Sequence, residues 1–267
     1  MDYGGAIDKH NRCLGNRAWC IKDICGIACV IATWLLILSA ELIVGALILV
    51  PSYANSTIFS ITNMFIFQAF AFLAFVSHLR AVLTDPGAVP LGNATNEMME
   101  QMCTKCCSSK PARAHHCSIC QRCIRKMDHH CPWINNCVGE NNQKYFVLFN
   151  LYIALMSMQS LLLVRMQFAE CLKNDWGSCS PISQPATIFL LAYLTYEGFV
   201  FGVLTIVVLA MQLNAIFNDQ TFTEQLKNEE AHWIKNSGLK SMFRHFSLTW
   251  FSPFTKPSYR YKFSYSV

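Results

Sequence analysis

Charged residues are scarce in this sequence. Only 14 % of its 267 residues are Asp, Glu, Lys or Arg, whereas soluble domains carry about a quarter. The deficit lies in four long apolar stretches at 24–50, 58–83, 145–164 and 186–213. A helix needs about 20 apolar residues to cross a bilayer. The sequence therefore predicts an α-helical integral membrane protein with four transmembrane helices.

Several targeting and nucleotide-binding signals are also missing. The polar N-terminal 23 residues are followed by an apolar run that is too long for a cleavable signal peptide. Position 2 is Asp2 and not the glycine that myristoylation needs, and the C-terminus has no prenylation box. There is no P-loop, Rossmann fingerprint or internal repeat. We expect the chain to be anchored by spanning the membrane.

Lysine and arginine are distributed unevenly between the connecting segments. Residues 51–57 contain none and residues 168–185 contain only Lys173, so by the positive-inside rule these loops are lumenal and the other segments cytosolic. The predicted organisation is a cytosolic N-terminus (1–23), helices 1 and 2 (24–83), a cytosolic cysteine-rich domain (84–144), helices 3 and 4 with a lumenal loop at 165–185 (145–213), and a cytosolic tail (214–267).

The net charge of +5 is spread over segments beside the membrane. Its expected counterparts are anionic headgroups or a phosphate-bearing ligand, and not nucleic acid. We interpret the basic residues within 12–22 and 227–262 as charges that retain the helix ends on the cytosolic side.

Cysteine and histidine, by contrast, are concentrated between positions 103 and 137. Two C-x2-C pairs and several further donors there favour two structural zinc sites, because so small a loop has little apolar core and metal would supply its folding energy. A reducing compartment also favours metal ligation or catalysis over disulfides. Two sites need eight ligands from twelve candidates: Cys103, Cys106, Cys107, Cys117, Cys120, Cys123, Cys131, Cys137, His115, His116, His129 and His130. Spacing alone does not identify the four that are left over.

Cys171 and Cys179 fall in the predicted lumenal loop. They are either a disulfide or two free thiols.

The run Asp128-His129-His130-Cys131 contains what a cysteine nucleophile needs. Such a cysteine requires a base within reach, and the base requires a group that orients it. One histidine can ligate zinc and so fix the segment, while the other acts as base for Cys131 with Asp128 holding its ring. The residues alone do not decide which histidine takes which role.

One spaced series of motifs extends through the whole cysteine-rich region. It comprises Asp85-Pro86-Gly87, Cys103-x2-Cys106, Lys110-Pro111-x-Arg113, His116-Cys117-x2-Cys120-x2-Cys123, Asp128-His129-His130-Cys131, Cys137 and Asn142. This series resembles the DHHC family of membrane protein S-acyltransferases (palmitoyltransferases). The four spans, with the cysteine-rich loop between the second and third, match the family along most of the chain. The sequence around the motifs is most similar to that of the Golgi-resident branch of the family.

The resemblance implies a role for each candidate. One zinc would be held by Cys103, Cys106, His116 and Cys123, and the other by Cys117, Cys120, His130 and Cys137. Cys131 would be the nucleophile, His129 its base and Asp128 the orienting group. The basic edge of Lys110, Arg113 and His115 would meet the phosphates of coenzyme A, or else be a solvated loop face.

The implied reaction moves palmitate from palmitoyl-CoA to Cys131, and then to a cysteine of a membrane-associated protein substrate. The acyl chain would lie in a cavity involving Met156, Trp34 and Trp133; Trp34 could equally face lipid, and Trp133 could equally pack in a core. Golgi membrane is the expected location, with the ER as alternative. Tyr265-x-Val267 suits a PDZ-type partner, and a homo-oligomer is left open.

Two positions depart from the family pattern. Thr221-Phe222-Thr223-Glu224 has Phe where the family's TTxE motif has its second threonine, so the hydroxyl for a hydrogen bond there is missing. Ser252 stands where relatives often have Asn.

Three other functions compete with the enzyme. A membrane-anchored zinc scaffold would have no use for the spare thiol of Cys131, the spans carry few polar residues for a channel or transporter, and the ligand spacing differs from a RING-type ligase.

Overall fold

The chain folds into two compact units. The computed structural model describes residues 10–15, 17–52, 56–91, 102–176, 179–227 and 248–256. Residues Ala28–His78 and Val147–Gln212 form one unit, which we call the helical unit. Residues Met1–Ile27, Leu79–Phe146 and Leu213–Val267 form the other, which we call the cysteine-rich unit.

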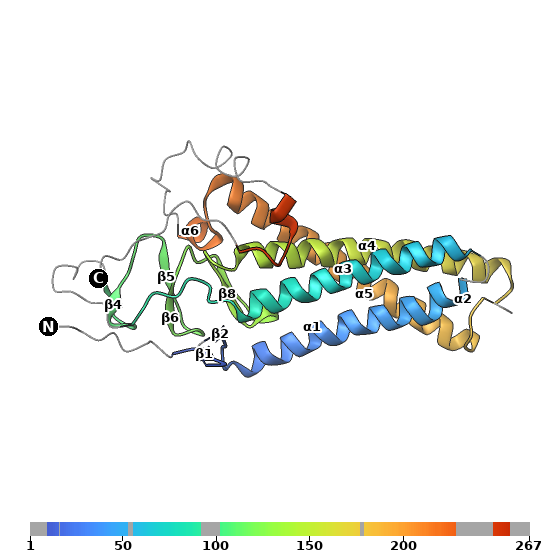
Figure 1. Cartoon of the computed structure of the whole chain (residues 1–267), viewed down its shortest axis with the longest axis horizontal. Coiled ribbons are helices and arrows are strands. Elements are labelled where there is room, and N and C mark those ends of the chain that lie inside the picture. The colour runs from blue at the N-terminus through green and yellow to red at the C-terminus, as the bar shows by residue number, and fades with distance from the viewer. Residues whose placement is uncertain are drawn as a thin grey trace. The chain divides into compact units, whose positions relative to one another are not determined.

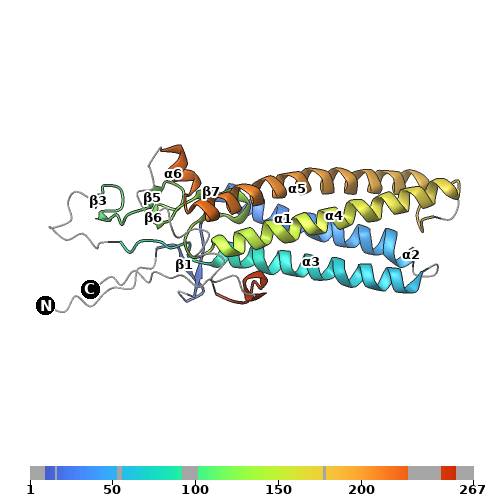
Figure 2. The same cartoon turned by 90° about the horizontal axis from the view of Figure 1, so that it is seen from above.

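Four helices are long and apolar enough to cross a membrane, as predicted. The first begins as α1 (Ile24–Ile43) and continues through the π-helix η1 (Val44–Leu49) into α2 (Val50–Ser52). The others are α3 (Thr57–Leu83), α4 (Gln143–Lys173) and α5 (Gln184–Asn218). Within the helical unit the four run side by side in both views (Figure 1, Figure 2). α4 and α5 extend beyond their apolar stretches, because helical hydrogen bonding continues into the flanking polar residues.

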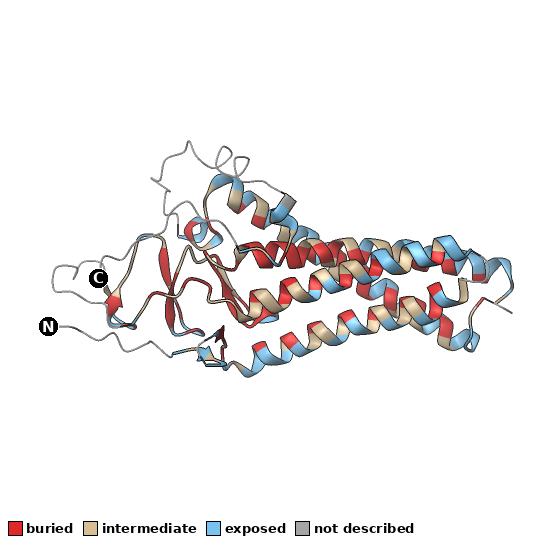
Figure 3. Ribbon diagram, viewed as in Figure 1, coloured by how far each residue is buried: buried red, intermediate tan, exposed pale blue. Residues whose placement is uncertain are grey.

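Helix α4 is the most buried of the four. In its most apolar window 72 % of the residues are buried, against 22–28 % in the other three, and Figure 3 shows this burial mainly in the first part of α4. Its Met156 and Leu163 belong to the apolar core of the helical unit, together with Ile37 and Val44 of the first span and Phe67 of α3. The other three helices leave large apolar side chains exposed, as lipid-facing helices do.

The cysteine-rich unit is built from short antiparallel ribbons instead of a large sheet. Its two-stranded pairs are β1 (Arg12–Cys13) with β2 (Ala18–Trp19), β3 (Met102–Cys103) with β4 (Ser108–Ser109), β5 (Ala114–Cys117) with β6 (Arg122–Arg125), and β7 (His129–Cys131) with β8 (Asn136–Val138). The register places His116 opposite Cys123 and His130 opposite Cys137. Hairpin pairing thus places metal-ligating side chains from the two strands of each ribbon opposite one another.

The apolar clusters of this unit are small and include the cysteines themselves. One joins Trp19, Ile21 and Ile124 to Cys117, Cys120 and Cys137. The other joins Val89 and Ala114 to Cys103, Cys106 and Cys123. Among the described residues, the unit's interior is therefore organised around its sulfur atoms, as expected for a fold that metal stabilises.

Two disulfides are present among the described residues. Cys171 and Cys179 are bonded, which is the first of the two alternatives that the sequence left open. A second disulfide, which the sequence did not suggest, joins Cys13 to Cys20 in the β1–β2 hairpin.

Candidate active site and metal centres

The first metal-ligating cluster comprises Cys103, Cys106, His116 and Cys123, whose ligand atoms lie within 4.8 Å of one another. Strand β3 supplies Cys103, the turn after it Cys106, and the β5–β6 pair the other two. The Nδ1 atom of His116 lies 3.1 Å from Sγ of Cys106 and 3.7 Å from Sγ of Cys103. One imidazole nitrogen therefore faces the thiols across a closed site.

The second cluster comprises Cys117, Cys120, His130 and Cys137, also within 4.8 Å. The Nδ1 atom of His130 lies 3.6, 3.4 and 3.7 Å from the sulfurs of Cys117, Cys120 and Cys137. The sulfurs of Cys120 and Cys137 are 3.5 Å apart. The Nε2 atom of His130 is buried and has no hydrogen-bond partner in the described part of the chain.

Both clusters fit a tetrahedral zinc ion. With Zn–S near 2.3 Å and Zn–N near 2.0 Å, ligand atoms in such a site lie about 3.5–3.8 Å apart. Most of the separations above agree with that range. Hydrogen bonds from Cys120 and Cys137 hold the pKa of the Cys117 thiol well below its usual range, whereas the bond to Cys117 raises the pKa of Cys137. The thiols thus restrict one another's ionisation, and a cation among them would relieve that conflict.

Cys131 lies outside both clusters. It ends β7 and is only 7 % exposed. His129 lies two residues before it on the same strand, and the Nδ1 atom of His129 forms a 2.7 Å hydrogen bond with Oδ2 of Asp128. The edge of the His129 ring also packs against Phe146 at 5.5 Å between centroids. Since His130 faces the second cluster, His129 is the histidine that is left for Cys131.

The electrostatics of His129 reflect this position. Burial alone would lower the pKa of its imidazole. Hydrogen bonds with Asp128 and with Cys131, together with their charges, outweigh burial and raise the pKa of His129 to about 9. The arrangement therefore stabilises the protonated imidazolium of His129 beside Cys131.

Asp128 is itself held by a segment far along the chain. It is 1 % exposed, and its Oδ1 accepts a 2.7 Å hydrogen bond from the backbone N–H of Phe222. The hydroxyl of Thr223 donates to the backbone carbonyl of Asp128. Because the Phe222 contact uses only the main chain, the missing threonine hydroxyl does not remove it. Sequence reasoning missed Thr223.

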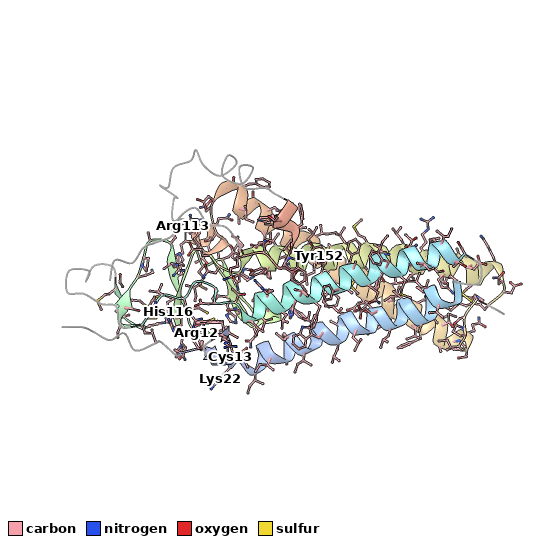
Figure 4. All side chains as sticks on the ribbon, viewed as in Figure 1. Arg12, Cys13, Lys22, Arg113, His116 and Tyr152 are labelled. Atoms are coloured by element: carbon pink, nitrogen blue, oxygen red, sulfur yellow. A yellow bond between two sulfur atoms is a disulfide. The ribbon has the colours of Figure 1, made fainter. Side chains whose placement is uncertain are left out.

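The same segment is fixed by Arg113. Helix α6 (Phe222–Leu226) starts with a capping box in which Thr221 and Glu224 exchange hydrogen bonds. The guanidinium of Arg113 donates to both carboxylate oxygens of Glu224, at 2.6 and 3.0 Å. It also donates to Oδ1 of Asp219 at 3.1 Å, and Figure 4 labels it just ahead of β5. The Thr221–Glu224 segment is thereby joined to the strand that bears the zinc ligands.

A pair of substitutions tests this support. Thr223→Val removes the hydroxyl that bonds the Asp128 carbonyl, and we expect the acylation rate to fall about five-fold, since one such hydrogen bond contributes about 1 kcal/mol. Phe222→Thr keeps the backbone N–H and should change the rate less than about two-fold. Single-turnover autoacylation measures both. A larger loss in Phe222→Thr than in Thr223→Val would contradict the assignment.

The residues predicted to meet coenzyme A have different surroundings. His115 is 4 % exposed, and its Nδ1 lies 2.9 Å from Nζ of Lys227. Arg113 is engaged with the carboxylates of Glu224 and Asp219. Lys110 is partly exposed and follows β4.

The residues predicted to line the acyl cavity belong to both units. Met156 is 4 % exposed in the core of the helical unit. In the same unit, the indole N–H of Trp34 donates to Nδ1 of His78 at 3.0 Å, a partner that the sequence did not suggest. Trp133, in the cysteine-rich unit, is 38 % exposed.

The C-terminal segment is only partly described. Ser252 is the second position that departs from the family pattern. Its hydroxyl accepts a hydrogen bond from the Phe254 N–H. Lys144 of α4 donates to the Thr249 carbonyl and to Thr255. The tail motif Tyr265-x-Val267 lies outside the described residues.

Comparison with known proteins identifies a family. The family model for DHHC palmitoyltransferase matches residues 96–229. Palmitoyltransferase ZDHHC3 of Homo sapiens is 53 % identical over 253 residues, covering 90 % of this chain and 84 % of that protein. Palmitoyltransferase ZDHHC7 of Mus musculus is 48 % identical over 255 residues, covering 90 % and 82 %. Probable protein S-acyltransferase 12 of Arabidopsis thaliana is 34 % identical, covering 67 % of each chain.

Proposed function

This chain belongs to the DHHC palmitoyltransferase family and is a protein S-acyltransferase, and from that premise we propose that it transfers palmitate through an acyl-enzyme on Cys131. The donor is palmitoyl-CoA and the acceptor is a cytosolic cysteine of a membrane-associated protein. The observation that carries the proposal is the position of Cys131: it belongs to neither metal-ligating cluster and adjoins the hydrogen-bonded His129–Asp128 pair.

The chemistry consists of two thioester exchanges. The Cys131 thiol gives its proton to His129, and the thiolate attacks the acyl carbonyl carbon of palmitoyl-CoA. A new C–S bond forms to Cys131, the bond to the CoA sulfur breaks, and CoA leaves as a thiolate that takes up a proton. A substrate cysteine then attacks the acyl-enzyme and restores the Cys131 thiol. Both thioesters are similar in energy, so the enzyme mainly positions and activates the reactants.

Asp128 orients His129 in this scheme. Its carboxylate binds His129 Nδ1 on one oxygen and the Phe222 N–H on the other, so the imidazole plane is fixed relative to Cys131. The zinc ions, when bound, would be structural, because four protein ligands leave no open position. Their part is to fix β5, β6, β7 and β8, which carry the ligands and the nucleophile.

We further propose that coenzyme A meets the edge of Lys110, Arg113 and His115, where Lys110 is the least engaged of the three. Lys110→Ala should raise the KM for palmitoyl-CoA about five-fold and leave kcat unchanged, because one exposed cation near a phosphate contributes about 1 kcal/mol to binding. Steady-state acylation over a range of palmitoyl-CoA concentrations measures this. Lys105→Ala, an exposed lysine of the same loop, is the matched control. Equal KM values in the two variants would remove Lys110 from the CoA site.

The acyl chain is proposed to lie in a cavity that involves Met156, Trp34 and Trp133, and the flexible side chain of Met156 should admit a palmitoyl chain and disfavour longer ones. The proposed location is the Golgi membrane, with the ER as the alternative. The distribution of lysine and arginine favours a cytosolic position for both termini and for the cysteine-rich unit. A PDZ-type partner at Tyr265-x-Val267 and a homo-oligomer remain proposals.

The proposed function is tested on purified full-length protein without an acceptor. Incubation with labelled palmitoyl-CoA should give a hydroxylamine-sensitive adduct that peptide mapping places on Cys131. If protein with its full zinc content takes up no label, the zinc scaffold becomes the better explanation.

A further inference from the structure

A cavity of about 600 Å³ lies in the cysteine-rich unit, apart from the active site. It is lined by the β1–β2 hairpin, the last turn of α3, the first turn of α4 and Lys256. None of its lining residues is a metal-cluster ligand or a member of the Asp128–Cys131 tetrad. Neither the acyl-transfer chemistry nor the zinc sites account for it.

The lining of this cavity is strongly cationic. Arg12, Arg17, Arg80 and Lys256 contribute positive charge, against the single carboxylate of Asp85. That carboxylate is already engaged, because one of its oxygens pairs with Arg12 at 2.5 Å and the other accepts the N–H groups of Gly87 and Ala88.

The other three cations have no carboxylate partner in the described part of the chain. Arg80 donates to the Tyr145 hydroxyl at 2.7 Å and lies over its ring at 4.8 Å. Arg17 and Lys256 are exposed and have no side-chain partner among the described residues. Cations that share a cavity repel one another, so an anion that joined them would stabilise this arrangement.

The lining also has an apolar part, contributed by the hairpin and by the end of α3. Leu79 and Leu83 are four residues apart and so share one face of α3. Trp19 contributes a further wall and is 1 % exposed. Helices α3 and α4 are both long enough to cross a bilayer, and the cavity lies at the end of α3 and the start of α4. A ligand there must combine an anionic group with an apolar one.

We propose that this cavity binds the phosphate group of an anionic phospholipid. Its volume is within the roughly 300–1,000 Å³ that is typical of ligand pockets, guanidinium groups are suited to phosphate oxygens, and basic clusters beside a span attract anionic headgroups. The phosphate of the bound lipid would attract Arg17, Arg80 and Lys256 together and reduce their mutual repulsion. The bound lipid would thereby join the β1–β2 hairpin to the end of α3 and the start of α4. This role of the basic residues is more specific than retaining helix ends on the cytosolic side.

The test is a binding measurement on the purified full-length protein. Native mass spectrometry would count adducts of phosphatidic acid and, in parallel, of phosphatidylcholine with the same acyl chains. Wild type should retain phosphatidic acid selectively, and the double variant Arg17→Gln with Lys256→Gln should lose roughly twenty-fold in affinity, since each basic residue near an anionic lipid contributes about five-fold. Both side chains are exposed without described partners, so the fold is not at risk, and unchanged zinc content verifies it.

The matched control is the double variant Lys22→Gln with Lys105→Gln. It removes the same charge from two exposed lysines of the cysteine-rich unit that do not line the cavity, and Figure 4 labels Lys22 near the hairpin. It should bind phosphatidic acid as wild type does. Equal losses in both double variants would mean general charge attraction and would overturn the proposal. Displacement of the lipid by millimolar CoA or inorganic phosphate would also overturn it, because the cavity would then accept soluble phosphate.

Discussion

The Cys131→Ser variant is expected to bind zinc as wild type does, to keep its thermal stability and to form no acyl-enzyme. Cys131 belongs to neither cluster of ligand atoms, and serine fills nearly the same volume in its buried position. A serine hydroxyl is a far weaker nucleophile at neutral pH than a thiol beside an imidazole, so the acylation rate should fall at least about a thousand-fold.

Three readouts on the same preparation check this expectation: metal content, thermal unfolding, and hydroxylamine-sensitive label from palmitoyl-CoA. Cys107→Ser is the matched control, because Cys107 is an exposed free cysteine of the same loop and is not a cluster ligand. It should be indistinguishable from wild type in all three. Zinc loss in Cys131→Ser, or persistent label on another cysteine of that variant, would show that the nucleophile has been misassigned.

The four spans could be predicted because they depend on local pattern, whereas the two ligand sets were implied by the family resemblance and agree with the clusters in the structure. Apolar length determines a span, and β-hairpin pairing between nearby positions brings His116 to Cys123 and His130 to Cys137. Helix ends were less predictable, since α4 continues to Lys173 beyond the apolar stretch.

The contacts around Asp128 could not be predicted from the same patterns. Phe222 and Thr223 are more than 90 residues away in sequence, and the Phe222 bond involves a backbone N–H that any residue except proline offers. The motif pointed to the missing hydroxyl at position 222, whereas the structure uses the backbone N–H of that residue. Arg113 illustrates a related limit. The fold places its guanidinium between Glu224 and Asp219, two carboxylates more than 100 residues away that only tertiary packing brings to it.

The Cys123→Ser variant is expected to lose zinc, stability and activity together. Cys123 is 1 % exposed, belongs to the first cluster and pairs with His116 across the β5–β6 ribbon. Strand β5 also carries Cys117, a ligand of the second cluster, so disorder in this ribbon reaches both sites. A structural zinc contributes about 10–16 kcal/mol, comparable with the whole stability of a typical domain at about 5–15 kcal/mol.

Metal analysis of Cys123→Ser should therefore show at least half of the zinc missing, with protease sensitivity in residues 102–142 and no detectable acyl-enzyme. Cys123→His offers a ligating nitrogen in place of the sulfur and should recover part of the zinc and of the activity, which a purely steric role of Cys123 would not allow. The contrast with Cys131→Ser separates the two kinds of cysteine: one change removes the reaction and leaves the metal, whereas the other removes the metal and the reaction with it. Identical behaviour of the two variants would mean that ligands and nucleophile have been divided incorrectly.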